Sequence, residues 1–154
     1  MESGIDLIRD DLSNIESVID YYEKSLSDFG KNLNLHGKNI MKALEEQPSW
    51  LSFYDARRVE LKAITEYMDT QVQRIRGRLW KDYTEKYSRD LQTKDKEQYI
   101  NNEPAYLDMF QLYLEVKELY EKYISAVESF KARGFVLNNV TRLLQSDSVD
   151  YMMS

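Results

Sequence analysis

The chain has 154 residues and a formal net charge of −6, with 31% charged residues, five glycines, two prolines and no cysteine. This length predicts one domain with a hydrophobic core, and the scarcity of Gly and Pro argues against a turn-rich β architecture. The lack of Cys excludes disulfides, thiol nucleophiles and zinc–thiolate sites. No apolar run approaches the length of a membrane span and the N-terminus lacks a secretion signal, so we expect a soluble, cytoplasmic protein with no membrane partner.

The first segment, residues 5–29, carries apolar residues in an alternating 3-4 spacing, which is the seam of a coiled coil. The residues of this seam are Ile5, Ile8, Leu12, Ile15, Ile19, Tyr22, Leu26 and Phe29. Gly30 then stands where a left-handed residue commonly ends a helix. Residues 31–47 keep a looser helical register, and Pro48 predicts a break, with Ser49 as the N-cap of the next helix.

A long helix is predicted over residues 50–91. At about 100° per residue, its basic residues Arg74, Arg78, Lys81 and Arg89 fall on a side well rotated from its apolar face. One helix can therefore bury one side and present a basic side to solvent. The apolar face repeats at Leu61, Ile64, Met68, Val72, Ile75, Leu79 and Tyr83.

Residues 92–102 are polar and are the best candidate for a loop. Pro104 suits the first turn of a following helix, with Asn102 before it as a cap. We expect Gly134 to close that helix, before a short final helix and an acidic tail. The helix carries a second seam at Met109, Leu112, Val116, Leu119, Tyr123, Ala126 and Phe130.

The predicted fold is all-α: long helices with coiled-coil-like seams form a helical hairpin or bundle that assembles into a homo-oligomer. We divide the chain into an N-terminal helical segment at residues 1–48, a helical core with the basic surface at 49–145, and a flexible acidic tail at 146–154. The seams suit an intermolecular coiled coil or an intramolecular core, and their spacing fits both. The candidate oligomerisation or core residues are Ile5, Ile8, Leu12, Ile15, Ile19, Leu112, Val116, Leu119, Tyr123 and Phe130.

The most informative feature is a basic segment inside an acidic chain. Residues 57–96 hold 11 of the 21 basic and 7 of the 27 acidic residues, a net of +4, so the remainder carries −10. Aromatic residues alternate with the cations, and cations for phosphates beside rings for bases are what binding of single-stranded nucleic acid requires. The candidate nucleic-acid-binding residues are Arg74, Arg76, Arg78, Trp80, Lys81, Tyr83, Lys86 and Arg89, with Tyr87 in the same strip.

The same segment also fits a simpler interpretation. Charged residues spaced four apart pair along a helix surface, as the spacings Arg78–Asp82, Lys81–Glu85 and Glu85–Arg89 allow. The aromatic residues fit a core or interface equally well. Composition does not separate nucleic-acid binding from internal ion pairing.

Enzyme chemistry finds little support. The only histidine is His36, so one chain offers no pair of histidines for acid–base catalysis or for a two-histidine metal site. There is no Gly-rich phosphate loop, and Gly77 stands alone within the predicted helix. We therefore expect no catalytic residue, no metal and no cofactor.

Residues 130–142, Phe-Lys-Ala-Arg-Gly-Phe-Val-Leu-Asn-Asn-Val-Thr-Arg, resemble the C-terminal Arg-Gly-Phe/Tyr block of the UvsY family, the recombination mediators of large tailed phages. The spacing from residues 99–103 to this block is similar to that of the family. Upstream, Arg76-Gly77-Arg78-Leu79 is similar to the family's short Lys/Arg-x-Arg-Leu motif on a long helix that precedes tyrosines. The resemblance covers residues 50–144, and before residue 50 it is one of helical character only.

The resemblance implies a protein that loads a RecA-like recombinase onto single-stranded DNA covered by single-strand binding protein. It implies a hexameric or heptameric homo-oligomer that contacts both of these partners in the cytoplasm of a phage-infected bacterium. The family's DNA-contacting basic pair corresponds to Arg76 and Arg78, separated here by Gly77 where the family has a better helix former. The alternative is a coiled-coil structural or assembly protein that binds a protein partner rather than DNA.

Overall fold

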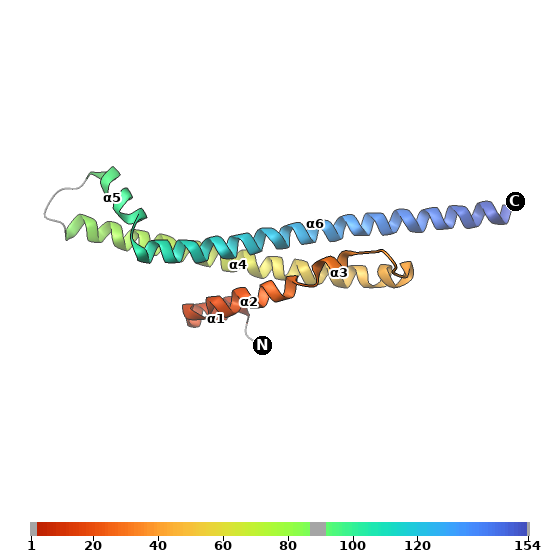
Figure 1. Cartoon of the computed structure of the whole chain (residues 1–154), viewed down its shortest axis with the longest axis horizontal. Coiled ribbons are helices and arrows are strands. Elements are labelled where there is room, and N and C mark those ends of the chain that lie inside the picture. Colours follow the sequence, from red (N-terminus) through yellow and green to blue (C-terminus); the bar gives the residue numbers. More distant parts are fainter. Residues whose placement is uncertain (1–2, 87–91, 154) are drawn as a thin grey trace. The chain divides into compact units, whose positions relative to one another are not determined.

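The computed structural model describes residues 3–86 and 92–153, with side chains up to residue 146. Within these residues all the regular secondary structure is helical and there is no strand, which confirms the predicted all-α class. One short 3₁₀ helix, η1, lies among six α-helices (Figure 1). In chain order the elements are α1 (Gly4–Asp10), η1 (Leu12–Asn14), α2 (Ile15–Leu26), α3 (Phe29–Leu33), α4 (Ile40–Glu85), α5 (Thr93–Asn101) and α6 (Pro104–Met153).

The helices form two compact units. The first combines Met1–Asp20 with Glu60–Tyr120, and the second combines Tyr21–Val59 with Glu121–Ser154. The two longest helices, α4 and α6, each contribute residues to both units. Among the described residues, no helix is both long enough and apolar enough to cross a lipid bilayer.

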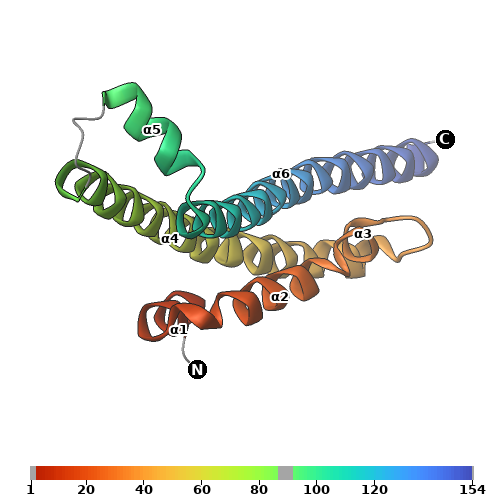
Figure 2. The same ribbon diagram turned by 60° about the vertical axis from the view of Figure 1, so that its left-hand side comes forward.

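The first unit contains α1, η1 and the start of α2 together with the C-terminal part of α4 and the first turns of α6 (Figure 2). Both predicted seams supply buried side chains here, so the chain uses them for its own core. Ile5, Leu12 and Leu112 are half-buried. The buried apolar residues of this unit are Ile8, Ile15, Val18, Ile19, Leu61, Ile64, Met68, Val72, Tyr83, Ile100, Val116 and Leu119.

The N-terminal seam does not lie on one continuous helix. Ser3 caps α1, because its hydroxyl accepts a hydrogen bond from the Asp6 N–H and donates one to the Asp6 carboxylate. Asp11 then adopts an extended conformation, and its carboxylate accepts from the N–H of Ser13 at 3.0 Å. This hydrogen bond lowers the pKa of Asp11. A coiled-coil seam needs a continuous helix, so the expectation of such a seam over residues 5–29 is wrong, because the Asp11 side chain starts a new turn.

The second unit has an aromatic core. The Tyr54 ring stacks on the Phe130 ring, with centroids 5.0 Å apart and planes 17° apart, and Phe29 meets both rings edge-on. The buried hydroxyl of Tyr123 donates to the carbonyl oxygen of Tyr22 at 2.7 Å. The seam residues Tyr123 and Phe130 thus pack between α2, α3, α4 and α6. Aromatic pairs of this geometry add to the free energy gained by apolar burial.

Two expected helix ends are wrong in the second unit. Gly30 lies within α3 and does not have a positive φ; the left-handed glycine is Gly37, at φ 73°, in the loop before α4. The helix α4 begins at Ile40 and continues through Pro48, which we expected to break it. Contacts on both sides of this proline hold the helix, because Ala43 and Tyr54 are buried. Tertiary packing of this kind outweighs local propensity.

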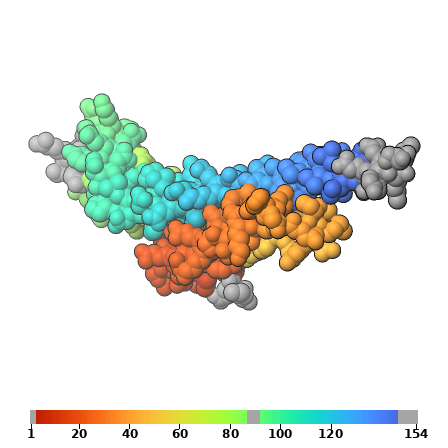
Figure 3. Space-filling view, turned by 45° about the vertical axis from the view of Figure 1, so that its right-hand side comes forward, coloured from red at the N-terminus to blue at the C-terminus, as the bar shows by residue number. Residues whose placement is uncertain are grey.

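The expected end of α6 at Gly134 is also wrong, because α6 continues to Met153 through the segment for which we predicted a short helix and a flexible tail. A Cβ on Gly134 would lie 3.0 Å from Nε2 of Gln47, so this glycine permits close packing of α4 on α6. In Figure 3 the blue residues of α6 lie beside the orange residues of α3 and the start of α4.

Candidate nucleic-acid interface

The exposed basic face lies on the last turns of α4. We use this name for Arg74, Arg78 and Lys81, whose side chains are all exposed. They fall within about 60° of one another around the helix and are rotated by roughly 120° from its buried residues. Burial of the apolar side of α4 therefore directs these three cations to solvent, as the sequence predicts.

The three cations of this face are not neutralised by ion pairs with described residues. The carboxylate of Asp82 pairs with Lys86 at 3.3 Å, and not with Arg78 as one interpretation of the spacing suggested. Among the residues that the structure describes, none forms an ion pair with Arg74, Arg78 or Lys81. Glu85 is exposed on the same helix and forms no ion pair with another residue that the structure describes. The face thus carries a net positive charge.

Arg76 points away from the basic face toward α5 and α6. Its Nη1 donates to Oδ1 of Asn101 at 3.1 Å, and its guanidinium lies 5.6 Å from the ring centroid of Tyr106. The side chain is half-buried by these contacts. Arg76 therefore anchors α5 and α6 to α4, in addition to any role in binding an anion.

Trp80 is half-buried under a cation from α5. The ammonium of Lys96 lies 5.2 Å from the indole centroid and donates to Oγ1 of Thr84 at 3.1 Å. This cation–π contact occupies one part of the ring. The sequence did not identify Lys96 as a site residue, since residues 92–102 were expected to form a loop.

Tyr83 is the clearest correction among the candidate site residues. It is only 8% exposed, its hydroxyl donates to the carboxylate of Glu103, and its ring stacks on Tyr99 at 5.7 Å. Its ring is therefore not available to stack on a base. Tyr87 and Arg89 lie outside the described residues.

The segment that covers Tyr83 is helical, so the expected loop at residues 92–102 is wrong. Asp95 lies in the first turn of α5, and Asn102 ends this helix rather than capping α6. Only Ile100 of α5 is fully buried, and the exposed Tyr99 packs on Tyr83. A helix with so few apolar contacts has almost no periodic signal in its sequence.

The chemistry that this surface offers is electrostatic. Exposed guanidinium and ammonium groups attract phosphates, and a partly exposed indole lies on a neighbouring side of the same helix. Among the described residues, no group of three or more His, Cys, Asp or Glu side chains is placed to hold a metal ion. Comparison with protein-family models, with curated proteins and with solved structures finds no match for the chain.

Proposed function

We propose that the protein binds single-stranded DNA through the exposed basic face and acts as a recombination mediator. One observation carries this proposal: Arg74, Arg78 and Lys81 project to solvent from one side of α4 without an ion pair to any described residue. In a chain of net charge −6, three unpaired cations on one side favour a polyanionic partner over solubility alone. Phosphate contacts of this kind bind nucleic acid without sequence preference.

The role of mediator rests on the resemblance to the UvsY family described above. Under this proposal the protein loads a RecA-like recombinase onto DNA covered by single-strand binding protein, and works as a homo-oligomer. Several copies would present several basic faces to one strand and gain affinity through avidity. Because both seams are used within the chain, self-association would need other surfaces, such as the exposed Phe135, Val136, Leu143 and Leu144 of α6.

The test compares two double variants with the same loss of charge. Arg74→Gln/Arg78→Gln removes two cations of the exposed basic face, and Lys62→Gln/Lys117→Gln removes two exposed cations elsewhere. Binding of a labelled thymidine oligonucleotide is measured by fluorescence anisotropy at several salt concentrations. We expect only the arginine variant to lose affinity, with the slope of log K against log salt shallower by about 1.4, or about 0.7 for each lost phosphate contact.

Equal affinity and equal salt slope in the two double variants would contradict the proposal. A parent protein that binds no oligonucleotide at low salt would favour the structural alternative, in which the basic face meets an acidic protein. Circular dichroism of each variant establishes that the helices are intact.

A further inference from the structure

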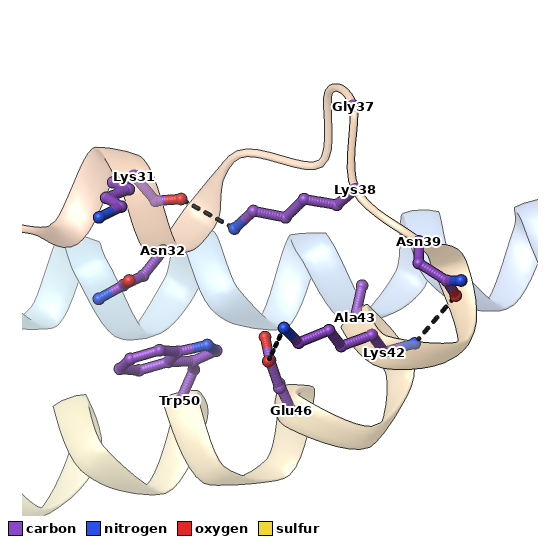
Figure 4. A pocket seen from close by; sticks show the side chains of 9 residues that line it. All are labelled: Lys31, Asn32, Gly37, Lys38, Asn39, Lys42, Ala43, Glu46 and Trp50. Atoms are coloured by element: carbon purple, nitrogen blue, oxygen red, sulfur yellow. Dashed lines mark hydrogen bonds and ion pairs between the residues drawn. The ribbon is translucent and has the colours of Figure 1, made fainter.

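A pocket of about 430 Å³ lies in the second unit, between α3, the loop that follows it and the start of α4 (Figure 4). Its volume is within the range of small-molecule sites. Its residues belong neither to the exposed basic face nor to the aromatic core. Binding of a ligand here is therefore independent of the proposed function.

The loop holds one wall of the pocket in place. Gly37 has φ 73°, a conformation that glycine adopts without strain, and it lets the chain turn back before α4. Lys38 follows, and its ammonium donates to the carbonyl oxygen of Lys31 at 2.9 Å, which ties the loop to the end of α3. The ammonium keeps its charge and its other two N–H donors.

Positive charge dominates the lining. Three lysines, Lys31, Lys38 and Lys42, line it with one acidic residue, Glu46. In Figure 4 the ammonium of Lys31 lies on the far side of its residue from Lys38 and Lys42, so Lys31 would contact a phosphate there after its flexible side chain turns toward the pocket. That carboxylate lies 3.9 Å from the ammonium of Lys42. Burial lowers the pKa of Arg133 and the negative charge of Glu46 opposes this shift, so Glu46 also acts on a second cation. The charges of Lys31 and Lys38 are therefore left without a carboxylate in the pocket.

The N-terminal end of α4 adds to this field. Asn39 caps the helix, because its Oδ1 accepts from the backbone N–H of Met41 at 2.9 Å and of Lys42 at 3.3 Å. These two backbone donors are thus already used. The positive end of the helix dipole still favours an anion beside it. A ligand here would be held by the lysine side chains, with the helix end as a secondary contribution.

Trp50 supplies a flat wall. In Figure 4 the face of its indole lies opposite Asn32, on the side of the pocket away from Lys38. The ring is fixed edge-to-face against Phe53, with centroids 6.0 Å apart. Its Nε1 is closed off from water and has no partner among the described residues, so the pocket offers the ring face rather than the N–H group.

We propose that this pocket binds a nucleotide, with the phosphate among Lys31, Lys38 and Lys42 and the base against the indole of Trp50. Lysine ammonium groups bind phosphates as point charges, and an indole face accepts any of the bases by stacking. A carboxylate ligand would use the cations but would gain nothing from the ring. A free mononucleotide and one unit of a DNA strand present the same chemistry to this pocket.

The chain permits a direct test because it has only two tryptophans, Trp50 and Trp80. In a Trp80→Phe background, tryptophan fluorescence reports on the pocket alone. We expect a saturable change in emission on titration with thymidine monophosphate and a much weaker one with thymidine, which lacks the phosphate. Lys31→Gln/Lys42→Gln in this background is expected to weaken nucleotide binding about tenfold or more, since one charge-assisted contact contributes about that factor. The charge-matched Lys62→Gln/Lys117→Gln variant should bind as the parent does.

An oligothymidylate titration identifies the source of the nucleotide. A response at much lower nucleotide concentration than with the monophosphate assigns the pocket to a DNA strand, and a response only to the monophosphate assigns it to a free nucleotide. The proposal is overturned by an absent response to both ligands, by equal binding in the Lys31→Gln/Lys42→Gln variant, or by a response to an acidic peptide alone. The titration follows the fluorescence of Trp50, whereas the proposed function is tested with the Arg74→Gln/Arg78→Gln variant. Either proposal can therefore fail without the other.

Discussion

Arg133 of α6 donates from Nη1 to Oε1 of Gln47 in α4 at 2.6 Å, and this contact joins two parts of the chain that are 86 residues apart. The same arginine donates from Nε to the carbonyl oxygen of Leu33 at 3.1 Å. Gln47 in turn donates from Nε2 to the carbonyl oxygen of Phe130 at 2.5 Å. At 4% exposure Arg133 is a buried charge, and it connects α3, α4 and α6.

We predict that Gln47→Leu lowers the free energy of unfolding by about 2 kcal/mol. The substitution removes the acceptor for Nη1, and Nη2 is already buried without a partner among the described residues. Of the acceptors that the structure describes, the guanidinium then keeps the Leu33 carbonyl alone. A hydrogen bond to a buried charged group contributes about 1.5–3 kcal/mol. Urea denaturation followed by circular dichroism measures the change. A loss below about 0.5 kcal/mol, the usual range for a surface site, would contradict the role of this contact.

Two glycines offer a matched comparison, because both lie inside long helices. Nothing lies within 4 Å of a Cβ added at Gly77, whereas one added at Gly134 would meet Nε2 of Gln47 at 3.0 Å. We predict that Gly77→Ala raises the free energy of unfolding by about 1 kcal/mol through helix propensity. The same change at Gly134 displaces Gln47 from its two hydrogen bonds and is expected to lower it by about 1 kcal/mol. Similar stabilisation by both substitutions, in the same denaturation assay, would contradict this prediction. It would show that the Gln47 side chain can move aside without lowering the free energy of unfolding.

The sequence predicts the buried faces of the long helices well, but it misses the short helix α5 and most of the helix ends. Apolar spacing depends on which side of a helix is buried, so the buried faces at Ile64, Met68, Val116 and Leu119 follow from periodicity alone. The position of a helix end depends on the segments of the chain that pack against it. Proline and glycine are local signals for a break, but Pro48 and Gly134 lie where α4 and α6 pack, and this packing is non-local.

The candidate site was predictable to the same extent. Rotation around α4 correctly predicts that Arg74, Arg78 and Lys81 are exposed. The burial and contacts of Arg76 and Tyr83 depend on α5. This polar helix covers one side of α4 and was not predicted from the sequence. The stacking of Tyr99 on Tyr83 could not be predicted without the position of this helix.

Arg76 and Arg78 are two residues apart, and we predict that they have separable effects. Arg76 bonds Asn101 at the end of α5, so Arg76→Gln should speed amide hydrogen exchange at residues 93–101, by about fivefold for each 1 kcal/mol lost. Arg78 has no ion pair among the described residues, so Arg78→Gln should leave this exchange unchanged and weaken oligonucleotide binding. Hydrogen-exchange mass spectrometry and anisotropy on the same samples make the comparison. Faster exchange in both variants, or in neither, would contradict the assignment of Arg76 to the α5 contact.

Tyr123 predicts an alkaline dependence of stability. Its ring is fully buried, its hydroxyl donates to the Tyr22 carbonyl, and burial raises its pKa. An unfolded tyrosine has a pKa of about 10, so above that pH the unfolded chain loses this proton while the folded chain retains it. The unfolded state then binds fewer protons, and the free energy of unfolding falls as pH rises. Below about pH 10 both states are protonated and this contribution is fully present.

We therefore expect Tyr123→Phe to be less stable than the parent by about 1 kcal/mol at neutral pH, through loss of one hydrogen bond. The variant should lose less stability than the parent between about pH 9 and pH 11, because the buried ionisable hydroxyl is gone. Burial also raises the pKa of Tyr54, so Tyr54→Phe/Tyr123→Phe should flatten the dependence further. Urea midpoints across this range, measured by circular dichroism, give the slopes. Parallel slopes for the parent and both variants would mean that neither hydroxyl is kept protonated by folding.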